Sequence, residues 1–179
     1  MIFGLFRRRT PSQVIATYTA IVAQARQPHF YASLDVPDTF DGRFELVMLH
    51  TILILERLRG GSEAESAFSQ DLFDVFFQDM DGTLREMGVG DVTVPKKVKK
   101  MAEAFYGRAA VYSQALKDEG THSLAEAVDR NLFADGAQPQ AAVAMARYIR
   151  SAADALEAQP ANGILDGRPN WPAATDFSK

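Results

Sequence analysis

Cysteine is absent from the 179-residue chain, and histidine is scarce. The absence of cysteine excludes disulfide bonds, thiolate zinc sites and thiol nucleophiles together. Only His29, His50 and His122 are available for imidazole chemistry. The sequence also lacks the glycine-rich phosphate loops and the G-x-S-x-G turn that presents a catalytic serine. We therefore predict a binding protein rather than an enzyme, with no cofactor.

An excess of positive charge and a long apolar run are missing too. The formal net charge is −4, whereas domains that bind nucleic acid through its phosphates are usually basic. No apolar run reaches the roughly 20 residues that a membrane-spanning helix needs. Hydrophobic residues make up 47% and charged residues 23% of the chain, which is typical of a soluble globular domain. These values indicate one cytoplasmic domain with no nucleic-acid partner.

The first nine residues, MIFGLFRRR, place apolar side chains before a cluster of cations. No signal-peptide cleavage site follows them. One interpretation is peripheral contact with the cytoplasmic face of the inner membrane, with the arginines on anionic headgroups. The other is a terminus that packs on the body or frays. The residues that would touch the membrane are Ile2, Phe3, Leu5, Phe6, Arg7, Arg8 and Arg9.

Apolar residues recur at helical spacing through most of the remaining chain, and no convincing alternating strand interrupts them. We expect an all-α, single-domain bundle of about six helices with irregular termini. The expected boundaries are a tail over 1–9, a helical domain over 10–159 and an irregular tail over 160–179, held to the body by Trp171 and Phe177. Residues 28–41 are expected to form a loop. Residues 44–58, which are apolar nearly all round, are expected to be the central helix.

Capping signals mark several of the expected helix ends. Side-chain caps are expected at Thr10, at Asp41 and in the capping boxes Ser62–Glu65 and Ser123–Glu126. Gly88 is expected to follow the end of a helix, because glycine readily adopts the left-handed conformation found there.

Residues 68–108 organise the chain. They read as an acidic, phenylalanine-rich helix, a turn broken by glycine, and a second helix that begins at Pro95. Apolar residues at helical spacing are most often plain core. Here the apolar face is wider than one packing partner requires, and its methionines suit a groove that accepts varied segments. The residues predicted to bind an apolar client are Phe73, Phe76, Phe77, Met80, Leu84, Met87, Met101, Phe105 and Tyr106.

Charged side chains accompany this face. Lysines in the first turns of a helix are disfavoured by the helix dipole by about 0.3–1 kcal/mol each, and such local conflicts tend to mark function. They form either a solvated face or a contact with polar loops or lipid headgroups. The aspartates have the alternative role of holding Arg85 or Arg108 and so fixing the turn. The residues predicted to make polar contacts are Asp79, Asp81, Arg85, Lys96, Lys97, Lys99, Lys100 and Arg108.

Two rival hypotheses remain open. Glu119 and His122 have the E-x-x-H spacing of di-iron bundles, although Gly120 and Thr121 between them indicate a turn. With His50 and Glu56 they define a metal-dependent or redox enzyme as the first rival. His50, inside an apolar helix, is more typical of a buried, hydrogen-bonded side chain than of a base. The second rival is a scaffold domain that dimerises through its aromatic face.

The stretch from Phe77 to Arg108, FQDMDGTLREMGVGDVTVPKKVKKMAEAFYGR, resembles the ubiquinol–cytochrome c chaperone family, the assembly factors of the cytochrome bc1 complex. The similar features are the aspartate pair, L-R-E-M-G-V-G-D, the Val-Pro-Lys restart and F-Y-G-R, in this order. The similarity runs from about Ser33 to Leu156. It carries much information about family and little about mechanism.

The resemblance implies a helical, non-enzymatic factor that acts on newly made cytochrome b, an apolar protein client. Mitochondrial members of the family work with a small partner protein and at the ribosome. This chain has no evident transit peptide, so it is similar to a bacterial member. The resulting hypothesis is a chaperone that holds an apolar segment of cytochrome b in the groove predicted above.

Overall fold

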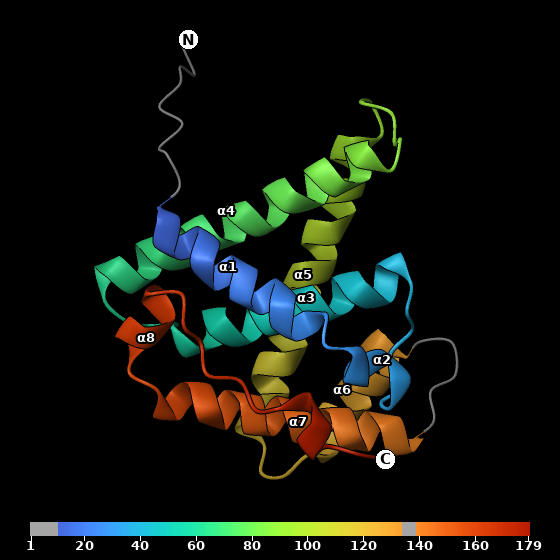
Figure 1. Cartoon of the computed structure of the whole chain (residues 1–179), viewed down its shortest axis with the longest axis vertical. Coiled ribbons are helices and arrows are strands. Elements are labelled where there is room, and N and C mark those ends of the chain that lie inside the picture. The colour runs from blue at the N-terminus through green and yellow to red at the C-terminus, as the bar shows by residue number, and fades with distance from the viewer. Residues whose placement is uncertain (1–10, 134–138) are drawn as a thin grey trace.

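The computed structural model describes residues 11–133 and 139–179 (Figure 1). Within these ranges every regular element is a helix, which confirms the predicted all-α, single-domain fold. The longer helices are α1 (Ser12–Ala25), α3 (Phe40–Arg57), α4 (Glu63–Glu86), α5 (Val94–Lys117), α6 (His122–Leu132) and α7 (Pro139–Ala158). Short elements complete the order, namely α2 (Pro28–Ala32), α8 (Ala161–Leu165) and the 3-10 turn η1 (Ala174–Asp176).

Helix α3 is the centre of the bundle, as its sequence predicts. Every residue from Leu46 to Ile54 is buried, because α3 packs against α1, α4, α5, α6 and α7. Full burial of one such aliphatic side chain contributes about 1.5–3 kcal/mol. The other helices are therefore positioned by the surface of α3.

The start of α4 carries the predicted capping box. The Ser62 hydroxyl accepts from the Glu65 amide, and the Glu65 carboxylate accepts from the Ser62 amide. The predicted cap at Asp41 is wrong. Helix α3 begins at Phe40, and the Thr39 hydroxyl accepts the Gly42 amide at 3.1 Å, which leaves Asp41 inside the first turn.

The capping box predicted over Ser123–Glu126 is also wrong. Helix α6 begins at His122, two residues before the start that an N-cap at Ser123 predicts, and makes no side-chain cap at its N-terminus. The Ser123 hydroxyl instead donates to Asp118 at 2.7 Å. The cap predicted at Thr10 lies outside the described residues.

The segment expected to be a loop, residues 28–41, contains the helical turn α2 and the start of α3. Pro28 occupies the first position of α2, where its missing amide hydrogen has no consequence. Phe30 is fully buried, so the apolar character of this segment reflects core packing.

The C-terminal segment is packed on the body, with α8 and η1 inside it. The Phe177 ring lies 5.4 Å from the Tyr148 ring, centroid to centroid, and its backbone carbonyl accepts from His29 Nε2 at 2.8 Å. Trp171 packs edge-on against His50. Both aromatic residues therefore hold the tail to the body, as predicted.

Helices α4 and α5 form a hairpin whose turn stands clear of the other helices (Figure 1). Helix α1 crosses the lower part of α4, and α6 and α7 lie at the far end of α5 (Figure 1). The molecule thus has a tightly packed body and one projecting arm.

Candidate functional site

A groove of about 360 Å³ lies where α3, α4 and α5 meet. Helix α3 and the residues after it supply Ile52, Leu55, Glu56 and Arg59. Phe73, Phe105, Tyr106 and Ala109 of α4 and α5 form most of the remaining apolar lining, and Ser66, Ser69 and Gln70 add a polar rim. Among the predicted client-binding residues, the groove therefore gathers Phe73, Phe105 and Tyr106.

Aromatic rings connect this groove to the core. Phe105 is 3% exposed and sits between Phe76 and Phe73, with ring centroids 5.5 Å and 5.3 Å away. Tyr106 lies 5.8 Å from Phe73 and is 63% exposed. Aromatic pairs at such separations stabilise each other beyond simple burial. The groove wall is therefore a preorganised surface that runs from the core to solvent.

The other predicted client-binding residues lie outside the groove. Phe76, Met80 and Leu84 are buried beneath neighbouring helices. Phe77 and Met101 are half-buried against the core, and Met87 is 57% exposed at the end of α4. The predicted apolar face thus consists of three parts: residues that are fully buried, residues that are half-buried and residues that line the groove.

Ile52 and Leu55 were not predicted to line a binding site. Both belong to the all-apolar run of α3, in which the periodicity does not distinguish a covered face from an uncovered one. Glu56 and Arg59 end the same run and pair at 2.7 Å, and Glu56 also accepts from the Ser113 hydroxyl at 2.9 Å. The change from apolar to charged residues at this helix end was the sequence feature that could have indicated an uncovered face.

Arg108 forms an ion pair with Glu45 of the same chain. Its guanidinium donates to both carboxylate oxygens of Glu45, at 2.9 Å and 2.7 Å, in the bidentate geometry that arginine favours. Burial raises the pKa of Glu45, and the hydrogen bonds and charge of Arg108 oppose that rise. Arg108 therefore ties α3 to α5, and its predicted contact with a partner stays a prediction.

Asp79 and Asp81 have different partners. Asp81 accepts from Arg85 one helical turn away, as the sequence predicts. Asp79 accepts a 2.7 Å hydrogen bond from the Tyr18 hydroxyl, which links α1 to α4. Burial, followed by this hydrogen bond and the charge of Asp79, raises the pKa of Tyr18. Tyr18 therefore remains a neutral donor.

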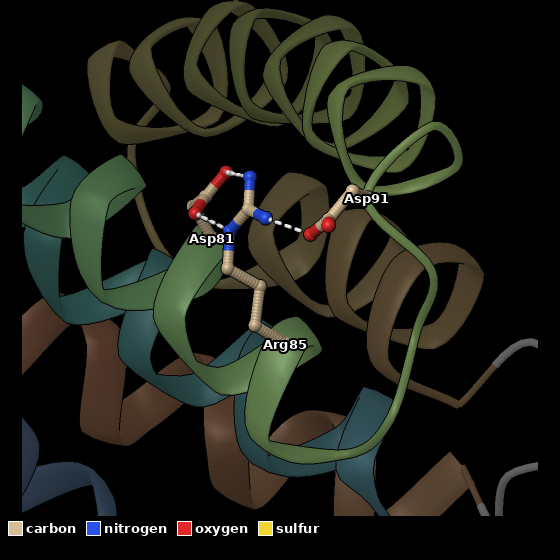
Figure 2. Close-up of polar contacts among 3 residues, drawn as sticks. All are labelled: Asp81, Arg85 and Asp91. Carbon is tan, nitrogen blue, oxygen red and sulfur yellow. Dashed lines mark hydrogen bonds and ion pairs between the residues drawn. The ribbon is translucent and has the colours of Figure 1, made fainter.

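The turn of the hairpin is held by Arg85 (Figure 2). Its guanidinium lies between the Asp81 carboxylate, at 2.6 Å, and the Asp91 carboxylate, at 2.5 Å. The backbone closes α4 with hydrogen bonds from Gly88 to Arg85 and from Val89 to Leu84. This is a Schellman motif, and Gly88 has the positive φ of +80° that it requires.

The four lysines of the hairpin are all exposed in the first turns of α5. Within residues 11–133 and 139–179, none of Lys96, Lys97, Lys99 and Lys100 forms an ion pair with a carboxylate. Their charges are therefore presented to solvent beside the turn.

The residues of the rival metal hypothesis are engaged separately. Both His50 ring nitrogens are hydrogen-bonded at 2.7 Å, Nδ1 to the Leu46 carbonyl and Nε2 to the Tyr148 hydroxyl. His50 is fully buried, as predicted, and desolvation lowers its pKa to about 4. His122 pairs with Glu126 at 3.3 Å. Over the part of the chain that the structure describes, no three metal-ligand side chains come together.

The predicted membrane contact over residues 2–9 lies outside the described residues. In the parts of the chain on either side of the gap at 134–138, none of the helices combines the length and apolarity needed to cross a bilayer.

Comparison with known proteins agrees with the resemblance carried by the hairpin. Residues 32–171 match the family described as Ubiquinol-cytochrome C chaperone. The chain is similar to ubiquinol-cytochrome c reductase complex assembly factor 1 from Mus musculus, with 24% identity over 86% of this chain and 52% of the mouse protein. The chain thus spans about half the length of that relative. The corresponding Xenopus laevis protein is 26% identical over 83% of this chain and 74% of its own.

A solved structure shares the whole fold. The crystal structure of the Cbp3 homolog from Brucella abortus is 38% identical, has a TM-score of 0.86, and is matched over 99% of this chain and 100% of its own. The helical fold described above is therefore a known architecture.

Proposed function

The chain belongs to the ubiquinol–cytochrome c chaperone family, and on this premise we propose that it is a non-enzymatic chaperone for assembly of the cytochrome bc1 complex. The client is an apolar segment of newly made cytochrome b. The proposed binding site is the groove between α3, α4 and α5. The names of the relatives support the complex as the target, and the geometry of the groove supports the kind of segment that is bound.

The exposed aromatic wall of the groove is the observation that carries this proposal. Tyr106 keeps 63% of its surface exposed although it adjoins the buried Phe105. A volume of about 360 Å³ lies near the lower end of the range for binding pockets, about 300–1,000 Å³. It is sized for a few side chains, such as those that an apolar helix presents at i, i+3 and i+4. The remainder of the client helix would lie across the polar rim.

A photo-crosslinking amino acid at position 106 tests the site. In a bacterium that expresses this chain and cytochrome b, the probe at Tyr106 is expected to capture newly made cytochrome b. The matched control is the same probe at Val143 of α7, an apolar residue 43% exposed and outside the groove lining. Equal capture at both positions, or none at position 106, would contradict the groove assignment.

A groove variant tests the function. Tyr106→Glu places a charge on the aromatic wall and is expected to lower the assembled bc1 complex, measured by its haem spectrum, while other respiratory complexes are unchanged. Val143→Glu is the matched control. If Tyr106→Glu folds as the parent does and the bc1 level stays at the parent value, the groove is not the client site. If deletion of the whole gene also leaves bc1 unchanged, the assembly role itself is wrong.

A further inference from the structure

The turn of the α4–α5 hairpin presents exposed apolar side chains at the end of the projecting arm. We call Met87, Val92 and the four lysines Lys96, Lys97, Lys99 and Lys100 the arm tip. Val92 is 79% exposed and Met87 is 57% exposed, among the highest values for large apolar residues in the described chain. The arm tip stands away from the body, so no other helix of residues 11–133 and 139–179 covers it (Figure 1).

Several hydrogen bonds hold the backbone of the turn at the arm tip. Arg85 bonds to Asp81 behind the turn and to Asp91 within it (Figure 2). Val94, two residues after Val92, is fully buried and anchors the start of α5. Backbone bonds from Thr93 and Val94 to the Gly90 carbonyl complete the turn. Val92 is therefore displayed by a fixed turn, with little conformational entropy to lose when it makes a contact.

Charge at the arm tip is opposite in sign to that of the whole chain. Residues 81–100 carry five cations and three anions, whereas the chain as a whole carries −4. Two of those anions, Asp81 and Asp91, share Arg85, and Glu86 is the third. The helix dipole adds positive potential where α5 begins. Glu103, one turn beyond the lysines, limits the positive surface to the tip.

We propose that the arm tip binds the surface of a bilayer that contains anionic lipid. Val92 and Met87 enter the headgroup region, and the lysines contact lipid phosphates. Apolar insertion combined with a cluster of cations is the usual composition of a peripheral membrane contact. This interaction does not depend on the groove and does not require a client.

The shape and chemistry of the tip favour lipid over an acidic protein. The tip is the end of a projecting hairpin, so it can meet an extended surface such as a bilayer (Figure 1). The four cations of the arm tip are all lysines, which act as point charges, whereas specific recognition of protein carboxylates favours the planar fork of arginine. At about 100° of rotation per residue, the four lysines spread over one broad, solvent-facing side of the first turns of α5.

Sedimentation of the full chain with lipid vesicles tests the proposal. The parent is expected to bind phosphatidylcholine vesicles that contain phosphatidylglycerol, to bind pure phosphatidylcholine vesicles weakly, and to lose binding as salt is added. Lys96→Gln/Lys100→Gln is expected to lower the partition coefficient about ten-fold or more. The matched control, Lys117→Gln/Arg130→Gln, removes the same charge from exposed positions away from the tip and is expected to change it by less than about two-fold.

A single fluorescent label locates the contact. Because the chain has no cysteine, Val92→Cys provides one thiol for an environment-sensitive dye. The dye is expected to shift to the blue on vesicles with phosphatidylglycerol, whereas the same dye at Val143→Cys is expected to keep its aqueous spectrum. Residues 1–9 are present in every variant and therefore contribute equally.

Two kinds of outcome, one on vesicles and one in cells, would overturn the proposal. Equal binding by the parent and Lys96→Gln/Lys100→Gln, or an unshifted dye at position 92, would place any lipid contact elsewhere. A loss of bc1 assembly in Lys96→Gln/Lys100→Gln cells, with vesicle binding intact, would show that the tip contacts an acidic protein. Neither result bears on the groove, which the crosslinking experiment tests separately.

Discussion

Polar groups differ between two regions of the molecule. Those in the body around α3 and α7 are buried and hydrogen-bonded, whereas those at the tip of the arm formed by α4 and α5 are exposed. In the body, the Gln24 amide donates to the Tyr148 hydroxyl, which donates to His50, which donates to the Leu46 carbonyl. Each of these groups has a partner, as buried polar groups require. In the arm, four lysines and the two apolar residues of the tip face solvent.

Arginine side chains extend the pattern of the body. Arg57 donates to the Leu156 and Gln159 carbonyls at the end of α7. Arg150 donates to the Leu116 and Gly120 carbonyls at the end of α5. Carbonyls at a helix C-terminus lack partners in their own helix, so each arginine caps a neighbour. The polar groups of the body therefore serve stability, whereas the four lysines of the arm tip are exposed to solvent and available for binding.

The largest expected effect comes from two leucines of α3 that differ in surroundings. Leu46 is fully buried and Leu55 lines the groove. Leu46→Ala is expected to lower the free energy of unfolding by about 3 kcal/mol, because it leaves a cavity in the core. Leu55→Ala is expected to lower it by less than half as much and to weaken client capture more. Urea unfolding measures the loss of stability, and the crosslinking assay measures client capture. Equal losses of stability in the two variants would contradict the difference in burial between body and groove.

The tie between Arg108 and Glu45 is expected to give the next effect. Arg108→Ala leaves a mostly buried carboxylate unpaired and is expected to lower the free energy of unfolding by about 2 kcal/mol. The double variant Arg108→Leu/Glu45→Leu removes both charges and is expected to recover part of this loss. Thermal unfolding of the parent, Arg108→Ala and the double variant measures the loss and the recovery. A double variant less stable than Arg108→Ala would refute the explanation.

Acid is expected to act on the body through His50. Its pKa is about 4 in the folded protein and about 6.5 when unfolded, so the unfolded chain binds the proton more readily. The stability contributed by neutral His50 is complete above pH 6.5 and declines as the pH falls toward 4. By pH 5 the loss is about 2 kcal/mol. Urea unfolding measures the free energy of unfolding at each pH between 7.5 and 5. This free energy is expected to fall more steeply with decreasing pH in the parent than in His50→Gln, and an equal pH dependence would contradict this account.

The smallest effect on stability is expected from Arg85. Its ion pairs with Asp81 and Asp91 are exposed, and pairs of this kind contribute at most about 1 kcal/mol. Arg85→Gln is expected to leave global unfolding nearly unchanged while amide exchange of Val89–Val94 becomes faster. Hydrogen exchange followed by mass spectrometry measures the local change. Unchanged exchange in this segment would show that the backbone bonds alone hold the turn.

Local patterns predicted much of the fold. The all-apolar run of α3 can be fully buried only at the centre of a bundle. The Ser62–Glu65 capping box depends on two residues only three positions apart. The errors are also local. At Asp41 and Ser123 a neighbouring residue starts the helix, and several side chains near a helix start are suitable caps.

The site depended on contacts that no local pattern contains. Phe73 and Tyr106 were predicted because they belong to one aromatic hairpin. The Arg108–Glu45 tie and the Tyr18–Asp79 bond join residues 63 and 61 positions apart. Which face of α3 remains open is decided by where α4 and α5 pack, so Ile52 and Leu55 became visible as groove residues only in three dimensions.

Helix α5 carries both the groove wall and the arm tip on one uninterrupted rod. Tyr106 and Lys96 are separated by about 15 Å along its axis at 1.5 Å per residue. A helix also turns by about 100° per residue, so one residue inserted between Lys100 and Phe105 would swing the tip by that angle relative to the groove. In the proposed mode of action, the register of this single helix therefore sets the direction in which a client is presented to the surface that the tip contacts.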